Sequence, residues 1–233
     1  MTRDTSFGKT ATALAAIGRG FYARGWALGT SGNFSAVVSR RPLRLAITSS
    51  SLPKGTLRAS DILECDDRGR VVGRRRGKPS AETLLHVEIA RQRGAGAVLH
   101  THSVWSTMLS GQVNTGQAGR VGQAGQSAGI VIEGYEMLKG LAGVTTHEHQ
   151  EVVPVVGNDQ DMTRLAVRVR GLLAQHPAAH AFLLRRHGLY TWGDTLADAE
   201  RHVEILEFLF ETIGRTQARS GAAGMSGGPL WPS

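Results

Sequence analysis

Apolar residues recur along the chain with two spacings, and each spacing predicts a different kind of element. Apolar positions three to four residues apart predict helices over 7–24, 80–93, 161–175 and 195–212, and shorter ones over 104–109 and 133–141. Short apolar runs bounded by turn residues predict strands over 34–39, 43–48, 62–65, 71–72, 97–103, 130–132, 151–156, 181–185 and 189–192. This alternation predicts a three-layer α/β/α fold in which helices flank a central, mainly antiparallel sheet.

Capping residues and composition mark where these elements and the domain end. The predicted helix N-caps are Ser6, Ser80, Asp159, and Asp194 or Thr195. A chain of 233 residues fits one domain, which we place over 1–214. Within it, the Gly/Gln-rich segment 111–129 buries little apolar surface and is predicted to be a flexible loop, and 215–233 is predicted to be a disordered tail.

The positive charge of the chain raises the question of an acidic partner. Lys and Arg outnumber Asp and Glu by 27 to 19, which gives a formal net charge of +8. The charge is scattered, and its densest run, Arg74-Arg75-Arg76, lies between two glycines with no nucleic-acid motif around it. We therefore interpret the run as a solvated loop and expect no nucleic-acid partner. A small anionic substrate would also benefit from a positive field.

Hydropathy and cysteine usage predict a location. We expect no association with a membrane, because no stretch approaches the 18 or so apolar residues of a membrane span. The N-terminal residues lack the apolar core of a secretory signal. The single cysteine, Cys65, excludes an internal disulfide framework and is interpreted as a small residue at a strand end. Together these features predict a cytoplasmic protein.

The predicted strand at 97–103 ends in two histidines, His100 and His102. Side chains two residues apart in a strand point to the same face, so the two imidazoles project together and Thr101 points away. Neutral imidazoles suit zinc, copper, iron and nickel, so the pair favours a metal site. In the alternative reading, one histidine packs in the core and the other is solvated.

A third ligand is needed, because a catalytic zinc takes three protein ligands and leaves one position open. His187 is the preferred candidate, since it directly follows an apolar strand and precedes Gly188, which permits a tight turn. The second H-x-H pattern, His147-Glu148-His149, lies in a polar stretch and is interpreted as mostly solvated.

Two loops and two carboxylates complete the candidate chemistry. The segments 26–33 and 48–55 are rich in glycine and small hydroxyl residues, so they offer N–H and O–H groups to a phosphate, although simple turn chemistry explains each of them alone. Glu82 and Glu136 are candidate proton-transfer groups. In the structural alternative, both are acids that favour the first turn of a helix.

Four motifs in this order resemble the class II, zinc-dependent aldolase family: Ser31-Gly32-Asn33, Lys78-Pro79-Ser80-Ala81-Glu82, His100-Thr101-His102 and Arg186-His187-Gly188. The segments 94–103, 135–140, 158–161 and 185–193 are similar to the branch of that family that dehydrates a methylthio-substituted ketose phosphate in methionine salvage. The likeness extends over about 7–214. Two features depart from it: the Gly/Gln-rich segment 111–129, and Ala81, where the sugar-phosphate aldolases carry a serine.

The resemblance implies one zinc ion per subunit on His100, His102 and His187. It implies a sugar-phosphate substrate whose phosphate is bound by Gly32, Asn33, Ser49, Ser50, Lys54 and Ser80. It also implies a cytoplasmic homo-oligomer, expected to be a tetramer, with active sites near subunit interfaces.

The resemblance also assigns the proton transfer. Glu136 is the first choice of acid/base residue, because it matches the family's residue in the motif Glu-Met-x-Lys-Gly, and Glu82 is a base, a shuttle or a neighbour of the metal. The implied reaction is loss of water from the ketose phosphate to give a diketone phosphate. The alternatives are a sugar-phosphate aldolase or epimerase of the fuculose or ribulose phosphate type, and a non-catalytic member of the family.

Overall fold

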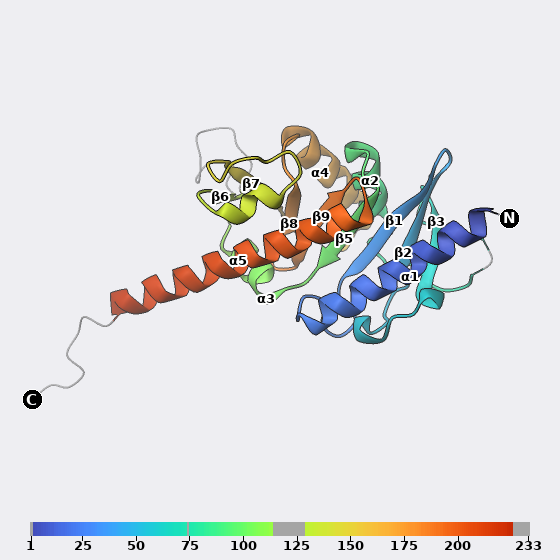
Figure 1. Ribbon diagram of the computed structural model, residues 1–233, viewed down its shortest axis with the longest axis horizontal. Helices are drawn as coiled ribbons and strands as arrows, with labels where there is room; N and C mark the ends of the chain where they lie inside the picture. Colours follow the sequence, from blue (N-terminus) through green and yellow to red (C-terminus); the bar gives the residue numbers. More distant parts are fainter. Residues whose placement is uncertain (1, 74, 114–128, 226–233) are drawn as a thin grey trace, which may run out of the picture.

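A single mixed sheet with helices on both faces forms the body of the protein (Figure 1). The computed structural model describes residues 2–73, 75–113 and 129–225. The helices are α1 (Thr2–Ala23), α2 (Thr83–Arg93), α3 (Val104–Gln112), α4 (Met162–Gln175) and α5 (Leu196–Met225), with 3-10 turns η1 (Lys54–Thr56), η2 (Ala59–Asp61) and η3 (Glu136–Gly140). The strands are β1 (Asn33–Arg40), β2 (Leu43–Thr48), β3 (Ile62–Asp66), β4 (Val71–Val72), β5 (Ala97–Thr101), β6 (Gly129–Ile132), β7 (Glu151–Val156), β8 (Ala181–Leu184) and β9 (Gly188–Gly193).

The sheet confirms the predicted fold class. Over the described residues its strand order is β4-β3-β2-β1-β5-β9-β8-β7-β6. Every neighbouring pair is antiparallel except β7 and β8, which run parallel. Consequently the C-terminal ends of β2, β5, β7 and β8 lie at the same edge of the sheet as the N-terminal ends of β1 and β9.

Each face of the sheet has its own apolar core. Helices α1, α3 and α5 cover one face, which is the near face in Figure 1, and α2 and α4 cover the other. The central strand β5 is buried along its whole length and contributes to both cores. Leu99 packs toward α1 and α5, and Val98 packs toward α2 and α4. Burying an aliphatic side chain of this size stabilises the fold by about 1.5–3 kcal/mol.

The predicted strands match the structure more closely than the predicted helix starts do. Strands β2 and β7 have the predicted bounds. Helix α1 already runs from Thr2, so Ser6 is an internal helical residue and not an N-cap. Helix α2 begins at Thr83 and its N-cap is Glu82, whereas Ser80 lies in the turn before the helix, where its carbonyl accepts the Thr83 N–H.

The other two helix ends also differ from expectation. Asp161 caps α4 by accepting the N–H groups of Thr163 and Arg164, whereas Asp159 binds the Arg164 side chain. Helix α5 continues to Met225, so 215–225 is helical and not a disordered tail. The tail residues 226–233 and residues 114–128 of the predicted flexible loop lie outside the described residues.

The structure also tests the interpretations of Cys65 and of the basic run at 74–76. Cys65 is buried within β3, and burial, together with the nearby Asp66 and Glu64 carboxylates, raises the pKa of its thiol to about 12. This agrees with a packing role. Arg75, interpreted as part of a solvated loop, instead donates to the Ile62 carbonyl.

Among the helices of the described residues, none is long and apolar enough to cross a membrane.

Replacing Gly188 by alanine tests the close approach of β9 to β5. A Cβ at Gly188 would lie 2.0 Å from the Thr101 carbonyl oxygen, so the two strands must separate. Gly188→Ala is expected to destabilise the protein by about 1–3 kcal/mol, as overpacked cores do. Thermal unfolding measures the change.

The matched control is Gly171→Ala, at an exposed position in α4 where a Cβ meets no atom within 4 Å. It is expected to leave stability unchanged or raise it by about 0.5–1 kcal/mol. Equal melting temperatures for the two variants would show that the β5–β9 contact carries no such constraint.

Candidate metal centre

Three histidines from distant parts of the chain meet at one edge of the sheet. The Nε2 atom of His102 lies 2.8 Å from that of His100 and 3.0 Å from that of His187, and the Nε2 atoms of His100 and His187 are 3.3 Å apart. The structure therefore brings together the three residues that the sequence predicted as metal ligands. His100 is fully buried, and the other two are half-buried.

The hydrogen bonds of His100 show that this cluster is suited to a cation. Nδ1 of His100 donates to the Leu189 carbonyl, 2.8 Å away, so in the neutral ring Nε2 carries the lone pair. Three ring nitrogens that share so small a space cannot all donate hydrogen bonds to one another. A divalent metal accepts all three lone pairs, and a carbonyl partner on the outer nitrogen is common for metal-bound histidines.

Electrostatics keeps the three rings unprotonated. Burial, followed by repulsion from the neighbouring imidazoles, lowers the pKa of His100 well below its usual value and that of His102 to about 2. Burial also lowers the pKa of His187. The rings are therefore neutral near pH 7, and metal binding does not have to displace protons from them.

Glu82 supplies a carboxylate beside the histidines. Its two carboxylate oxygens lie 3.4 Å from Nε2 of His100 and 3.5 Å from Nε2 of His187. The four side chains form a group that fits a divalent metal. Because Glu82 is the N-cap of α2 yet makes no capping hydrogen bond, its side chain is free to face the histidines.

A chain of buried hydrogen bonds orients Glu82 from behind. Nδ2 of Asn33 donates to Glu82, 2.6 Å away, and the Asn33 side-chain oxygen faces Nε2 of His86 at 2.5 Å. Nδ1 of His86 lies 2.8 Å from the hydroxyl of Ser35. With His86 donating through Nε2, its Nδ1 accepts from Ser35, and the side-chain polar groups in this series of hydrogen bonds are all paired. Burial lowers the pKa of His86 to about 4, so its ring is neutral.

Strand register and turn geometry place these side chains. Residues Asn33 and Tyr190 lie directly opposite His100 on its two neighbouring strands, so all three face the same side of the sheet. The ring of Tyr190 stacks on His100 with centroids 3.9 Å apart. His187 lies in the turn between β8 and β9, where Arg186 adopts a positive φ of 53°.

The candidate phosphate residues and the metal centre line one pocket of about 220 Å³. All six lie in it beside Glu82, His102 and His187: Gly32, Asn33, Ser49, Ser50, Lys54 and Ser80. Three lining residues were given no role from the sequence: Asn158, Gln160 and Met162, which follow the C-terminal end of β7. Two side-chain amides just after a buried strand are a signal that was available for them.

Lys54 and Gly32 shape this pocket by different means. Lys54 is almost fully buried, and its Nζ donates to the carbonyls of Thr30 and Leu52. Burial lowers the pKa of Lys54 to about 8. Gly32 has a φ of +74°, and a Cβ there would lie 2.7 Å from the His100 carbonyl oxygen, so only glycine lets this loop approach β5.

Glu136 does not join the metal centre within one chain. It is the first residue of η3, and its side chain is 72% exposed. Its carboxylate pairs with Lys139 at 2.6 Å and lies 3.8 Å from His147. Of the two predicted proton-transfer residues, the structure therefore brings only Glu82 to the histidines.

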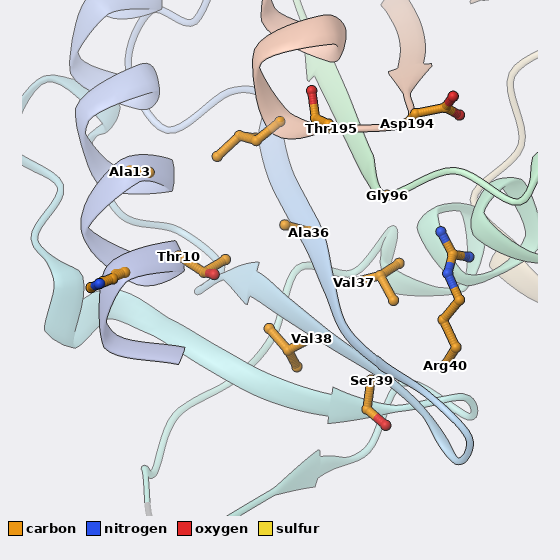
Figure 2. Close-up of a pocket in the computed structure, with 12 residues that line it drawn as sticks. Thr10, Ala13, Ala36, Val37, Val38, Ser39, Arg40, Gly96, Asp194 and Thr195 are labelled. Atoms are coloured by element: carbon orange, nitrogen blue, oxygen red, sulfur yellow. The ribbon is translucent and has the colours of Figure 1, made fainter. Parts of the chain in front are cut away.

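A larger cleft of about 660 Å³ lies elsewhere, between α1, β1 and the turn before α5 (Figure 2). Figure 2 shows Thr10, Val38 and Ser39 on one part of its wall and Gly96, Asp194 and Thr195 on another. Among its lining residues there is no histidine and a single carboxylate. The smaller pocket at the histidines is therefore the candidate active site.

The sequence matches one protein family and several named relatives. The model of the class II aldolase and adducin N-terminal domain matches residues 12–213. A methylthioribulose-1-phosphate dehydratase of Methylococcus capsulatus is 47% identical over 209 residues, which cover 89% of this chain and 94% of the relative. A protein with the same name from Sorangium cellulosum is 40% identical over 211 residues, which cover 90% of this chain and 93% of the relative.

Solved structures show the same fold. An L-fuculose 1-phosphate aldolase matches with a TM-score of 0.70 and 21% identity over 97% of this chain and 91% of its own. The L-fuculose-1-phosphate aldolase of Thermus thermophilus matches with a TM-score of 0.65 and 21% identity over 94% of this chain and 99% of its own. With the family match over most of its length and relatives at 40–47% identity, the chain belongs to the class II aldolase family.

Proposed function

We propose that this chain is a zinc-dependent hydro-lyase that dehydrates 5-methylthioribulose 1-phosphate to 2,3-diketo-5-methylthiopentyl 1-phosphate and water, in methionine salvage. The observation that carries the proposal is the single pocket in which a three-histidine centre and Glu82 adjoin loops suited to a phosphate. Relatives with the dehydratase name at 40–47% identity support this substrate.

The residues of the pocket act on two different parts of the substrate, its phosphate and its carbonyl. The Gly32–Asn33 turn, the Ser49–Ser50 loop, Ser80 and Lys54 hold the phosphate on C1, which leaves the C2 carbonyl facing the histidines. His100, His102 and His187 would hold a zinc ion, which when bound would supply Lewis-acid polarisation of that carbonyl and so make the C3 proton more acidic.

Proton transfer then requires a base at C3 and an acid at the departing C4 hydroxyl. Glu82 is placed to exchange a proton beside the carbonyl, because its carboxylate lies at the histidine centre and Asn33 holds one of its oxygens. Asn33 is in turn held by His86, so the direction of the Glu82 carboxylate is set before substrate arrives. We assign the acid at C4 to Glu136.

This assignment makes the active site a product of two subunits. Glu136 is exposed, and its contacts within the chain are with Lys139 and His147, so it would reach the metal centre of a neighbouring copy. Exposed apolar side chains support an oligomer: Val104 and Met108 on α3, and Phe208 on the adjacent α5, are each at least 50% exposed. We propose a cytoplasmic homotetramer.

An aldolase or epimerase is the second candidate function, since the solved L-fuculose 1-phosphate aldolases share the fold. The three reactions begin at the same polarised carbonyl and differ in the bond that breaks. A product assay separates them. We expect the purified chain with zinc to release a diketone phosphate from 5-methylthioribulose 1-phosphate, and to leave fuculose 1-phosphate and ribulose 5-phosphate uncleaved and unepimerised. Aldehyde release from either sugar phosphate, or its epimerisation, would favour the second function.

Mixed oligomers test whether Glu136 acts on a neighbouring subunit. Glu136→Gln is expected to lower kcat by at least about 100-fold, the usual scale of a lost acid/base group. His187→Ala is expected to lower kcat at least as far, because it removes a proposed ligand of the metal. When the two variants are co-expressed, some sites combine an intact His187 with an intact Glu136 from a neighbour, so activity returns in part. If hybrid oligomers form and no activity returns, Glu136 and His187 act within the same chain.

The pH dependence of phosphate binding tests Lys54. Its amine loses a proton as pH rises through its pKa of about 8, so the free protein loses a positive charge at the pocket. Inorganic phosphate is therefore expected to inhibit the wild-type enzyme less strongly above about pH 8.

Lys54→Met keeps the length and apolar stem of the side chain and removes its charge. This variant is expected to bind phosphate on the order of tenfold more weakly at neutral pH, about 1.4 kcal/mol, and to lack the alkaline step. An unchanged inhibition constant in Lys54→Met would remove Lys54 from the phosphate site.

A further inference from the structure

A second histidine and carboxylate cluster lies at the edge of the sheet opposite the candidate active site. Glu151 begins β7, and His180 immediately precedes β8. These two strands run parallel, so their N-terminal ends lie together. His187, by contrast, follows the C-terminal end of β8, which separates the two clusters by the length of that strand.

Two imidazoles converge on one oxygen in this cluster. Oε2 of Glu151 lies 2.9 Å from Nε2 of His149 and 2.9 Å from Nδ1 of His180. The Glu151 side chain is only 1% exposed, whereas those of His149 and His180 are 28% and 15% exposed. The sequence placed His149 in a mostly solvated stretch, but its ring is directed at this buried carboxylate. The cluster is thus reachable from solvent through its histidines.

The remaining side-chain polar atoms of His180 and Glu151 are held by the surrounding backbone. Nε2 of His180 donates to the Ala142 carbonyl, 2.8 Å away, so in the neutral ring Nδ1 has the lone pair that faces Glu151. Oε1 of Glu151 accepts the backbone N–H of His180 at 3.0 Å. These outer hydrogen bonds orient one donor atom of His180 and one of Glu151 toward a common point, as they do around bound metals.

The nearby His202 is excluded from this donor set by its own hydrogen bonds. Its Nδ1 donates to the Trp192 carbonyl at 2.7 Å, and its Nε2 accepts the N–H of Ala142 at 3.1 Å. Both ring nitrogens are therefore occupied. The set that remains consists of two imidazoles and one carboxylate, the ligand types that bind zinc and related divalent transition metals.

We propose that His149, Glu151 and His180 form a second binding site for a divalent transition metal, separate from the centre at His100, His102 and His187. The donor atoms of the three residues lie within 4.8 Å of one another. The ion joins the loop before β7 to the starts of β7 and β8, and water fills its open positions. Its binding does not depend on the proposed dehydratase reaction.

Zinc titration of the metal-free protein tests the proposal. Wild-type protein is expected to bind two zinc ions per chain, as measured by elemental analysis after dialysis and by competition with a chromophoric chelator. Both His149→Ala and Glu151→Gln are expected to bind one, and His187→Ala also one, because each removes a ligand from a single site. The double variant His149→Ala/His187→Ala is expected to lose both high-affinity equivalents.

The matched control is His147→Ala, which removes an exposed histidine two residues away in the same loop and is expected to keep two equivalents. Far-ultraviolet circular dichroism verifies the folding of each variant, and the partly exposed position of His149 keeps the test open if Glu151→Gln fails to fold. One equivalent in the wild-type protein, or a second equivalent that persists in His149→Ala, would overturn the proposal and leave the cluster as an ion pair.

Discussion

The position of β5 at the centre of the sheet is the constraint on which the rest of the site depends. This strand is buried along its length, and β1 and β9 pair with it in antiparallel register. A slip of one residue would exchange the two faces of the strand, turning His100 toward α5 and Thr101 toward the metal centre. Such a slip would bury polar groups without partners, because Thr101 now donates to the buried Glu207 carboxylate of α5 at 2.5 Å.

Around this strand the protein combines rigid placement with a neutral set of ligands. Burial keeps the three imidazoles unprotonated. The hydrogen bonds that link Ser35, His86 and Asn33 direct Glu82 toward them. The two loops proposed to bind phosphate join the same pocket because β2 ends at the edge where β1 begins. Under the proposed function, preorganisation of this kind would bind a metal and a phosphate at a fixed separation and give the carbonyl between them one orientation.

The geometry of the site suits several related reactions, and the relatives in the family favour one of them. A three-histidine centre beside a phosphate pocket suits any reaction that begins by acidifying a proton next to a ketone, so it serves aldolase, epimerase and dehydratase alike. The choice among them depends on the group that meets C3 and C4. In this chain Glu82 lies at the centre and Glu136 lies on the surface, so the proposed role of Glu136 requires a second subunit.

Local patterns in the sequence determined the sheet strands, the fold class and the three histidines, because burial and side-chain alternation leave direct traces in residue order. They also predicted the glycine-rich loops. Helix starts are less sharply marked, because neighbouring residues of similar type can each serve as the N-cap: the N-cap of α2 is Glu82 and not Ser80, and that of α4 is Asp161 and not Asp159. The role of His86 depends on Ser35 and Asn33, which are 51 and 53 residues away in the sequence. The roles of His149 and Asn158 depend on the meeting of strand ends, which brings His180 to Glu151 and the end of β7 to the histidine pocket, and only the tertiary structure makes these contacts.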